Sequence, residues 1–264
     1  MPFDGRRRRL ARRRGALRAE GLSARGLCKR WRNVVGVAGV DVDVRPGEVH
    51  GLLGPNGAGK TTVFRMLAGV EMPDAGEVWL DGVALGQLPL HRRAQAGLGY
   101  LPQDDCLFVD LDVAANVGIA ARLGVDVGGC LTLVGLDGFG PRRISGLSGG
   151  ERRRVAIARL LALKPRVLLL DEPFAGVDPV AVQAFGQLVR ALAETGVGVL
   201  ITDHAARETL ALCDRVTLLD AGVVQVVGSP AEVAADPRAR DRYLGRDFLL
   251  PAVAIAPQDR YDPS

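Results

Sequence analysis

Apolar residues follow two different spacings along this chain, and they predict two kinds of strand. Residues 40–44 alternate apolar and polar positions, which is typical of a strand with one face in the core. Residues 167–170 and 197–202 are aliphatic runs instead, as expected of strands that are covered on both faces. Helix-length segments such as residues 60–70 lie between the strand-like runs. The pattern predicts an α/β protein.

Polar residues with capping or turn chemistry place further elements. Asp112 is a typical N-cap, and we expect the helix that it starts to end before Gly124. The S-x-x-E spacing of Ser148 and Glu151 is that of a capping box and predicts a second helix start. Residues 124–146 are rich in glycine, and their pattern predicts no particular element.

A glycine-rich loop lies between a short predicted strand, residues 48–53, and the helix predicted over residues 60–70. It fits G-x-x-x-x-G-K-[ST], the phosphate loop of nucleotide hydrolases. Backbone N–H groups and the positive end of the helix dipole would point at one phosphate. Lys60 should reach the β- and γ-phosphates, and the Thr61 hydroxyl should bind Mg²⁺. The loop comprises Gly54, Pro55, Asn56, Gly57, Ala58, Gly59, Lys60, Thr61 and Thr62.

Two acidic residues, Asp171 and Glu172, follow the aliphatic run of residues 167–170. Carboxylates at the end of a buried strand are costly unless they have a partner. Beside a phosphate loop, Asp171 is the expected Mg²⁺ ligand, and Glu172 is placed to polarise a water for attack on the γ-phosphate. Acids that merely terminate a strand are the alternative.

Three further residues are candidates for the same site. Gln103 and His204 each follow a predicted strand, at the sheet edge where ligands collect. Gln103 could orient water or bind metal, or be an ordinary loop residue, and His204 could contact the γ-phosphate or be structural. Trp31 could stack on a nucleobase, or cover an edge of the core.

The chain has 264 residues and a formal net charge of +4, but its basic residues are concentrated at one end. Residues 1–18 hold eight arginines and one acid, and the rest has 26 of the 34 basic and 29 of the 30 acidic residues. Residues 1–16 are therefore expected to be a disordered tail. Such a tail could bind nucleic acid or anionic lipid. We favour the alternative that it is an extension from an upstream start codon.

The cysteines and the apolar runs do not point to export or membrane insertion. Four cysteines are scattered without C-x-x-C spacing, and no secretory apolar segment follows the N-terminus. We therefore expect a reducing cytoplasmic setting and no cysteine metal site. No apolar run approaches the roughly 18 residues of a membrane helix, so membrane contact should come only through partners.

The chain resembles the ATP-binding cassette (ABC) ATPases in six motifs that occur in the family's order. They are the phosphate loop at 54–62, Gln103, the signature Leu147-Ser148-Gly149-Gly150-Glu151, the aliphatic strand ending in Asp171-Glu172, Asp178 and His204. The resemblance implies a P-loop NTPase fold with a RecA-like core, an antiparallel β-subdomain and a small α-helical subdomain. Residues 17–248 would form the nucleotide-binding domain, with the helical subdomain at about 104–162 and a C-terminal tail at 249–264.

The same resemblance implies that the chain uses ATP and Mg²⁺ as a homodimer. In such proteins the signature segment of one subunit closes over the ATP that the phosphate loop of the other holds. Ser148 and Gly150 would thus complete the partner's site, and Asp178 would lie in a loop at the dimer interface. Trp31 falls where the family has its base-stacking aromatic residue. Gln103 would stand in the outer shell of a metal held by Thr61 and Asp171.

Within that family the chain looks most like the ATPases of lipopolysaccharide export transporters. The residues that carry this likeness are 88–94, 99–103, 148–154, 171–179, 201–204, 207–210 and 243–248. It implies integral membrane subunits as partners and a position on the cytoplasmic face of the inner membrane. The chain departs from the family pattern between Asn116 and Leu147, a segment that is shorter and more glycine-rich than the usual helical subdomain.

Two other functions stay open. One is the ATPase of another transporter, such as a branched-chain amino-acid importer. The other is a non-transport role through nucleic-acid binding by the arginine tail. The acidic balance outside the tail argues against the second, so no nucleic-acid partner is expected.

Overall fold

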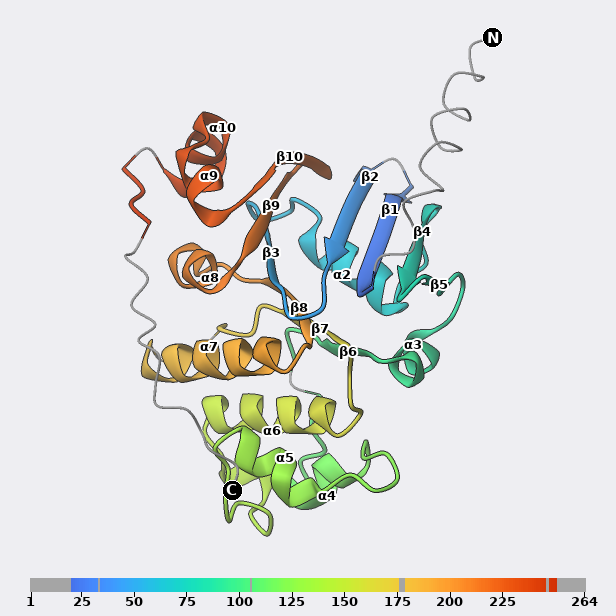
Figure 1. Ribbon diagram of the computed structural model, residues 1–264, viewed down its shortest axis with the longest axis vertical. Helices are drawn as coiled ribbons and strands as arrows, with labels where there is room; N and C mark the ends of the chain where they lie inside the picture. The colour runs from blue at the N-terminus through green and yellow to red at the C-terminus, as the bar shows by residue number, and fades with distance from the viewer. Residues whose placement is uncertain (1–19, 33, 105, 176–178, 246, 251–264) are drawn as a thin grey trace.

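The computed structural model describes residues 20–32, 34–104, 106–175, 179–245 and 247–250. Figure 1 shows two sheets with helices packed around and below them. Asp178, the tail at 1–16 and residues 251–264 of the C-terminal tail lie outside the described residues, and the predictions made for them stay predictions.

The first sheet is antiparallel, with the strand order β2-β1-β4-β5. Residues 40–44 belong to its strand β2 and alternate as predicted, because Val40, Val42 and Val44 are buried and the aspartates between them are not. The strands are β1 (Leu22–Trp31), β2 (Val34–Val44), β4 (Ala75–Leu80) and β5 (Val83–Ala84).

The second sheet has the order β10-β9-β3-β8-β7-β6 and is parallel except at β10, which pairs antiparallel with β9. The parallel arrangement brings the carboxyl ends of its strands to one edge, where ligands bind in open α/β sheets. The strands are β3 (Val49–Leu53), β6 (Leu98–Leu101), β7 (Val167–Asp171), β8 (Gly198–Thr202), β9 (Arg215–Asp220) and β10 (Val223–Gly228).

Helices cover both faces of this second sheet. They are α2 (Lys60–Ala68), α3 (Leu90–Ala96), α4 (Val113–Gly118), α5 (Val127–Leu133), α6 (Gly149–Leu161), α7 (Pro179–Glu194), α8 (Ala206–Leu212), α9 (Pro230–Ala235) and α10 (Pro237–Ala239), with short turns η2 (Ile144–Gly146) and η3 (Arg240–Leu244). Helix α2 shares a core with the antiparallel sheet on one side, and α6, α7 and α8 form the core on the other.

Strand β7 shows how the two cores meet. Val167 and Leu169 pack into the core that contains α2, whereas Leu168 and Leu170 pack into the core that contains α6 and α7. All four side chains are buried. The continuous aliphatic run that predicted a strand covered on both faces is thereby explained, and the predicted α/β class is confirmed.

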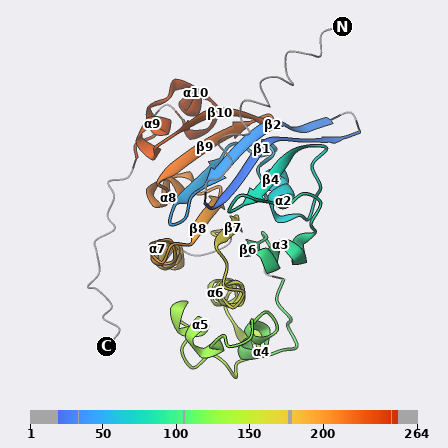
Figure 2. The same cartoon turned by 45° about the vertical axis from the view of Figure 1, so that its right-hand side comes forward.

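Helices α4, α5 and α6 pack on one another below the sheets, as both Figure 1 and Figure 2 show. The Asp112 side chain caps α4 by accepting from Ala115 N at 2.7 Å, and α4 ends at Gly118, before Gly124 as predicted. Helix α5 lies in the glycine-rich stretch for which the pattern predicted no element. The limits of a helical subdomain at about 104–162 remain a prediction.

In the part of the chain that the structure describes, every helix is too short or too polar to span a membrane.

Candidate functional site

The phosphate loop joins β3 to α2 in a tight backbone path that depends on glycine. Gly54 and Gly59 have φ values of 151° and 102°. A Cβ on Gly54 would lie 2.0 Å from the Leu219 carbonyl oxygen, and one on Gly59 would lie 2.6 Å from that of Gly36. Any side chain at either position would therefore displace the loop.

Lys60 begins α2 and turns its side chain back over the loop. Its Nζ donates to the carbonyl oxygens of Gly54 at 2.7 Å and Pro55 at 3.0 Å. Burial lowers the pKa of Lys60, while the nearby carboxylates of Glu172 and Asp171 act in the opposite direction. The loop thus holds a desolvated cation at the N-terminus of α2, which suits a phosphate.

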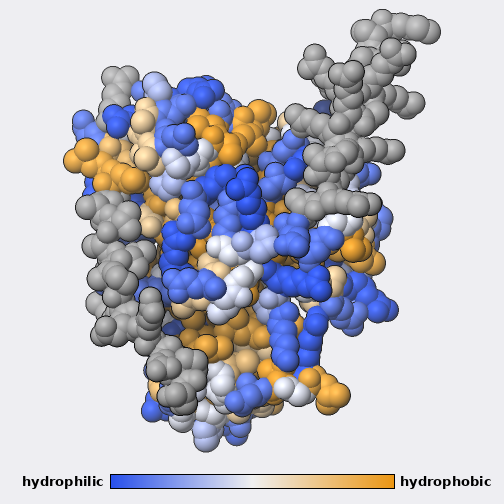
Figure 3. All heavy atoms as spheres, in the orientation of Figure 1, coloured by the Kyte–Doolittle hydropathy of each residue, from blue (hydrophilic) through white to orange (hydrophobic). Residues whose placement is uncertain are grey.

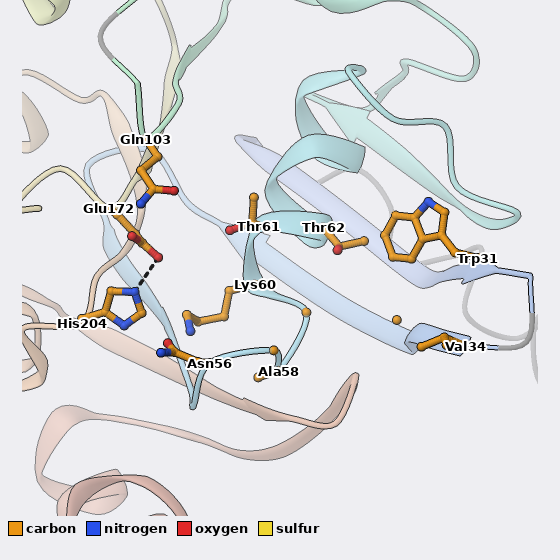
Figure 4. A pocket seen from close by; sticks show the side chains of 13 residues that line it. Trp31, Val34, Asn56, Ala58, Lys60, Thr61, Thr62, Gln103, Glu172 and His204 are labelled. Atoms are coloured by element: carbon orange, nitrogen blue, oxygen red, sulfur yellow. Dashed lines mark ion pairs between the residues drawn. The ribbon is translucent and has the colours of Figure 1, made fainter.

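Glu172 and His204 follow β7 and β8 and are brought together by the parallel sheet. Glu172 Oε1 lies 2.7 Å from His204 Nε2, as the dashed line in Figure 4 shows. Glu172 N donates to the Thr202 carbonyl at 2.8 Å, and its φ is 50°. That backbone conformation is uncommon outside glycine and often marks a functional residue.

Asp171 stands beside α2 with its two carboxylate oxygens on different partners. Oδ1 accepts from the Thr61 hydroxyl at 3.5 Å, and Oδ2 accepts from the Tyr100 hydroxyl at 3.4 Å. Burial, and next the charge of Glu172, raise the pKa of Asp171 to about 6. A cation beside this carboxylate would favour its charged form.

A cleft of about 450 Å³ opens over the phosphate loop and over Glu172 and His204. Its lining joins most of the sequence-predicted residues: Trp31, Asn56, Gly57, Ala58, Gly59, Lys60, Thr61, Thr62, Gln103, Glu172 and His204, with Val34 and Gly36. In Figure 4, Gln103 stands next to Glu172, and Trp31 lies at the far end beyond Thr62. The cleft therefore runs from the candidate catalytic pair to an aromatic residue.

Trp31 sits on the tip of the β1–β2 hairpin, and 43% of its surface is exposed. A Cβ on Gly36 would lie 2.4 Å from the Trp31 ring. Gly36 thus leaves room for the indole to lie against β2. An exposed ring at the end of a phosphate-binding cleft favours base stacking over covering of the core.

The signature residues do not line this cleft. Ser148 and Glu151 form the predicted capping box at the start of α6, with Ser148 N donating to Glu151 Oε2 at 2.7 Å. Leu147 is buried, Ser148 and Gly149 are exposed, and Gly150, in the first turn of α6, is half-buried. The single chain therefore leaves this turn available to another molecule.

Sequence reasoning missed three residues that shape the site. Tyr100 holds Asp171, and the buried Asp203 accepts from Phe174 N at 2.7 Å and Ala205 N at 3.0 Å. The Arg153 guanidinium reaches the backbone of both Gln103 and Glu172. Tyr100 lies in the strand that leads to Gln103, and Asp203 directly precedes His204, so both carried a positional signal.

Among the described residues, no three His, Cys, Asp or Glu side chains gather as a metal cage. The Thr61 hydroxyl and the Gln103 amide line the cleft, and the buried Asp171 carboxylate lies behind Thr61, with Oδ1 at 3.5 Å from the Thr61 hydroxyl. Hard oxygen donors in small number, completed by water and phosphate, are what Mg²⁺ uses in nucleotide sites. The residues present fit Mg²⁺.

Comparison with known proteins gives one consistent result. A family model described as ABC transporter matches residues 37–175. The chain is 46% identical to the lipopolysaccharide export system ATP-binding protein LptB of Acidithiobacillus ferridurans, covering 88% of this chain and 100% of that protein. It is also 46% identical to a probable ABC transporter ATP-binding protein of Azorhizobium caulinodans, covering 88% of this chain and 86% of that protein.

Solved structures agree with the sequence relatives. The cbiO1 protein of Clostridium perfringens, part of an ABC transporter complex, superposes with a TM-score of 0.75 at 28% identity, covering 83% of this chain and 92% of that one. A dimeric ATP-binding cassette in a post-hydrolysis state with ADP and Pi superposes with a TM-score of 0.70 at 25% identity, covering 79% of this chain and 98% of that one.

Proposed function

This chain belongs to the ABC transporter family and is an ATPase, and we propose that it powers a transporter that extracts lipopolysaccharide from the inner membrane for export. The relative named LptB, whose whole length it covers, supports this assignment. The proposal includes the roles of the individual site residues, Mg²⁺ as the metal, and the subunits with which the chain assembles.

One observation carries the catalytic part of the proposal. Glu172 Oε1 and His204 Nε2 lie 2.7 Å apart in a cleft that the phosphate loop also lines. A carboxylate held by an imidazole at the phosphate end of such a cleft is placed to accept a proton from water. Glu172 is the general base in this scheme, and His204 steadies the γ-phosphate.

The remaining residues bind and orient the nucleotide. The N–H groups of the loop and Lys60 offset the charge of the phosphates, and Trp31 stacks on the base. Thr61 and Asp171 would hold Mg²⁺, with Gln103 in its outer shell, and the metal would supply positive charge to offset that of the transferring phosphoryl group. Tyr100 fixes the carboxylate of Asp171 from the side away from Thr61.

A second copy of the chain would complete each site. Ser148 is exposed, Gly150 is half-buried, and both lie outside their own cleft, which fits a role at the partner's ATP in a head-to-tail homodimer. The solved cassette with ADP and Pi is dimeric. Asp178 would line that interface. Hydrolysis removes the group that both subunits bind, so the dimer would open.

Membrane subunits would dock on the helical part of the molecule. Large apolar side chains are exposed there, and the lower part of Figure 3 shows apolar surface over this region. The exposed residues are Phe108, Val109, Ile119, Leu123 and Leu133. Exposed apolar surface of this kind marks an interaction site. The chain would thereby reach the cytoplasmic face of the membrane through its partners.

Glu172→Gln tests the catalytic proposal. It removes the proton acceptor but keeps the shape of the side chain, so we expect kcat to fall by roughly a hundredfold or more with ATP binding preserved. Steady-state hydrolysis and binding of a fluorescent ATP analogue measure the two effects. Glu194→Gln, on an exposed position of α7, is the matched control. Wild-type turnover in Glu172→Gln would remove Glu172 from its role.

Purification with native membranes tests the transported substrate. We expect polytopic membrane subunits to co-purify with the chain, and lipopolysaccharide to stimulate hydrolysis by the reconstituted complex. Stimulation by a branched-chain amino acid and its binding protein instead would assign the chain to an importer. Neither result bears on Glu172.

A further inference from the structure

One arginine on α6 joins the two strand ends that carry the candidate catalytic residues. Arg153 is buried, with 5% of its surface exposed. Its Nη1 donates to the carbonyl oxygens of Pro102 at 2.9 Å and Gln103 at 3.1 Å. Its Nη2 donates to those of Asp171 at 3.0 Å and Glu172 at 3.3 Å.

Each terminal nitrogen of this guanidinium therefore serves one strand end. Nη1 binds the backbone that follows β6, and Nη2 binds the backbone at the end of β7. The two strands are neighbours in the parallel sheet. Arg153 itself lies on α6, which begins at the turn after Ser148. One side chain thus connects three parts of the molecule that the mechanism requires.

The bridge that Arg153 forms between the ends of β6 and β7 needs the shape of arginine as well as its charge. A guanidinium presents N–H donors in a rigid planar fork, so it can hold two pairs of carbonyls at once. A lysine has a single nitrogen at the end of a flexible chain. It could bind one strand end but could not keep both in a fixed relation.

We propose that Arg153 is a positioning residue that fixes Gln103 and Glu172 relative to each other and ties both to the signature helix α6. The proposal rests on the proposed ATPase mechanism and deepens it. A movement of α6 toward or away from a partner's nucleotide would be transmitted to the backbone of both residues. Arg153 touches backbone oxygens and not the cleft, so it would affect turnover without forming part of the nucleotide cradle.

Arg153→Lys tests this proposal, with Arg154→Lys as its control. Arg154 is the next residue of α6, and its Nη1 donates to the Gly135 carbonyl at 3.3 Å, away from both strand ends. We expect Arg153→Lys to lower kcat on the order of tenfold or more, because small errors in position are costly in catalysis. Its affinity for a fluorescent ATP analogue should stay within about twofold of wild type. Arg154→Lys should retain wild-type turnover.

Hydrogen exchange gives a second readout that does not depend on activity. In Arg153→Lys the peptide that contains Gln103, the peptide that contains Glu172, or both should exchange faster than in wild type, and neither should change in Arg154→Lys. Wild-type exchange at both strand ends in Arg153→Lys would contradict the bridge. Wild-type kcat in Arg153→Lys would overturn the positioning role.

The outcomes separate this inference from the proposed function. A wild-type chain that fails to hydrolyse ATP would sink the proposed function, while hydrogen exchange would still decide whether Arg153 bridges the strands. Arg153→Gln, which keeps two N–H donors, provides a second variant if the lysine variant melts early. If both variants unfold under assay conditions, Arg153 is a core residue and the positioning role is wrong.

Discussion

His50 is a buried imidazole away from the cleft, and its surroundings make folding sensitive to pH. Only 1% of its surface is exposed, its Nδ1 lies 2.6 Å from the Asp43 carbonyl oxygen, and its Nε2 lies 2.9 Å from Thr217 Oγ1. Burial, and next the positive charge of Arg215, lower the pKa of His50 to about 4. The folded chain therefore holds His50 neutral at pH values where the unfolded chain would protonate it.

We predict that the chain loses stability in mild acid because of this residue. Between the unfolded pKa of 6.5 and the folded pKa of about 4, the unfolded state binds more protons, so stability falls as pH falls. The contribution of His50 to this loss should reach about 2 kcal/mol between roughly pH 7.5 and pH 5. Asp171, whose pKa is raised to about 6, acts in the opposite direction, so the comparison of wild type with His50→Asn in urea unfolding at both pH values measures the contribution of His50. His50→Asn should reduce the difference, whereas His91→Asn, at an exposed position, should leave it unchanged.

At the scale of elements, helix α2 is held at both ends by very different chemistry. Its first turn faces the phosphate loop, and its last turn faces the fully buried guanidinium of Arg93. Arg93 donates to the carbonyls of Met66 and Leu67 at 2.9 and 2.7 Å, and to Leu88 and Gly86 at 2.8 and 2.9 Å. A cation at a helix C-terminus also opposes the helix dipole.

Arg93→Met should therefore destabilise the fold by at least about 3 kcal/mol, because it leaves buried carbonyl oxygens without donors. Arg92→Met, one residue earlier on the exposed side of α3, should change stability by less than about 0.5 kcal/mol. Denaturant unfolding compares the two. Equal effects of both substitutions would show that the α2 carbonyls find water or other donors.

The sequence predicted the elements with strong local signals and missed those that depend on distant partners. The phosphate loop, the run of residues 167–170 and the capping box at Ser148 each combine a spacing with a specific chemistry, and all lie where predicted. Arg93 and Arg153 bind carbonyls 27 and 51 residues away. Nothing in the sequence distinguishes such arginines from those on a surface.

The candidate site was predictable for a different reason. Gln103, Glu172 and His204 each follow a strand of one parallel sheet, so the topology brings them to one edge without any knowledge of side-chain contacts. The helix α5 was less accessible to prediction. Tertiary packing against α6 stabilises α5 despite its two glycines, and the local pattern carries no trace of that partner.

At the scale of the whole molecule, the proposed dimer can be tested by mixing two variants of the chain that are each defective alone. A Lys60→Ala chain has a defective phosphate loop and an intact signature turn, and a Ser148→Arg chain has the reverse. Mixing them should form heterodimers with one complete site, since in the proposed dimer each ATP would need Lys60 from one chain and Ser148 from the other. We expect the mixture to retain more ATP on size-exclusion chromatography than the two separate variants combined. Simple additivity would argue against the head-to-tail arrangement.

Strand β7 separates two independently packed interiors and ends in the residues of the candidate site. Adjacent side chains along it, such as those of Leu168 and Leu169, therefore pack into opposite halves of the protein. Trimming a methyl group at one would loosen the layer of α6 and α7, and trimming at the other would loosen the layer of α2. Second-site substitutions that restore stability to these two mutants should therefore lie in different halves of the protein, although the two original substitutions are neighbours in sequence.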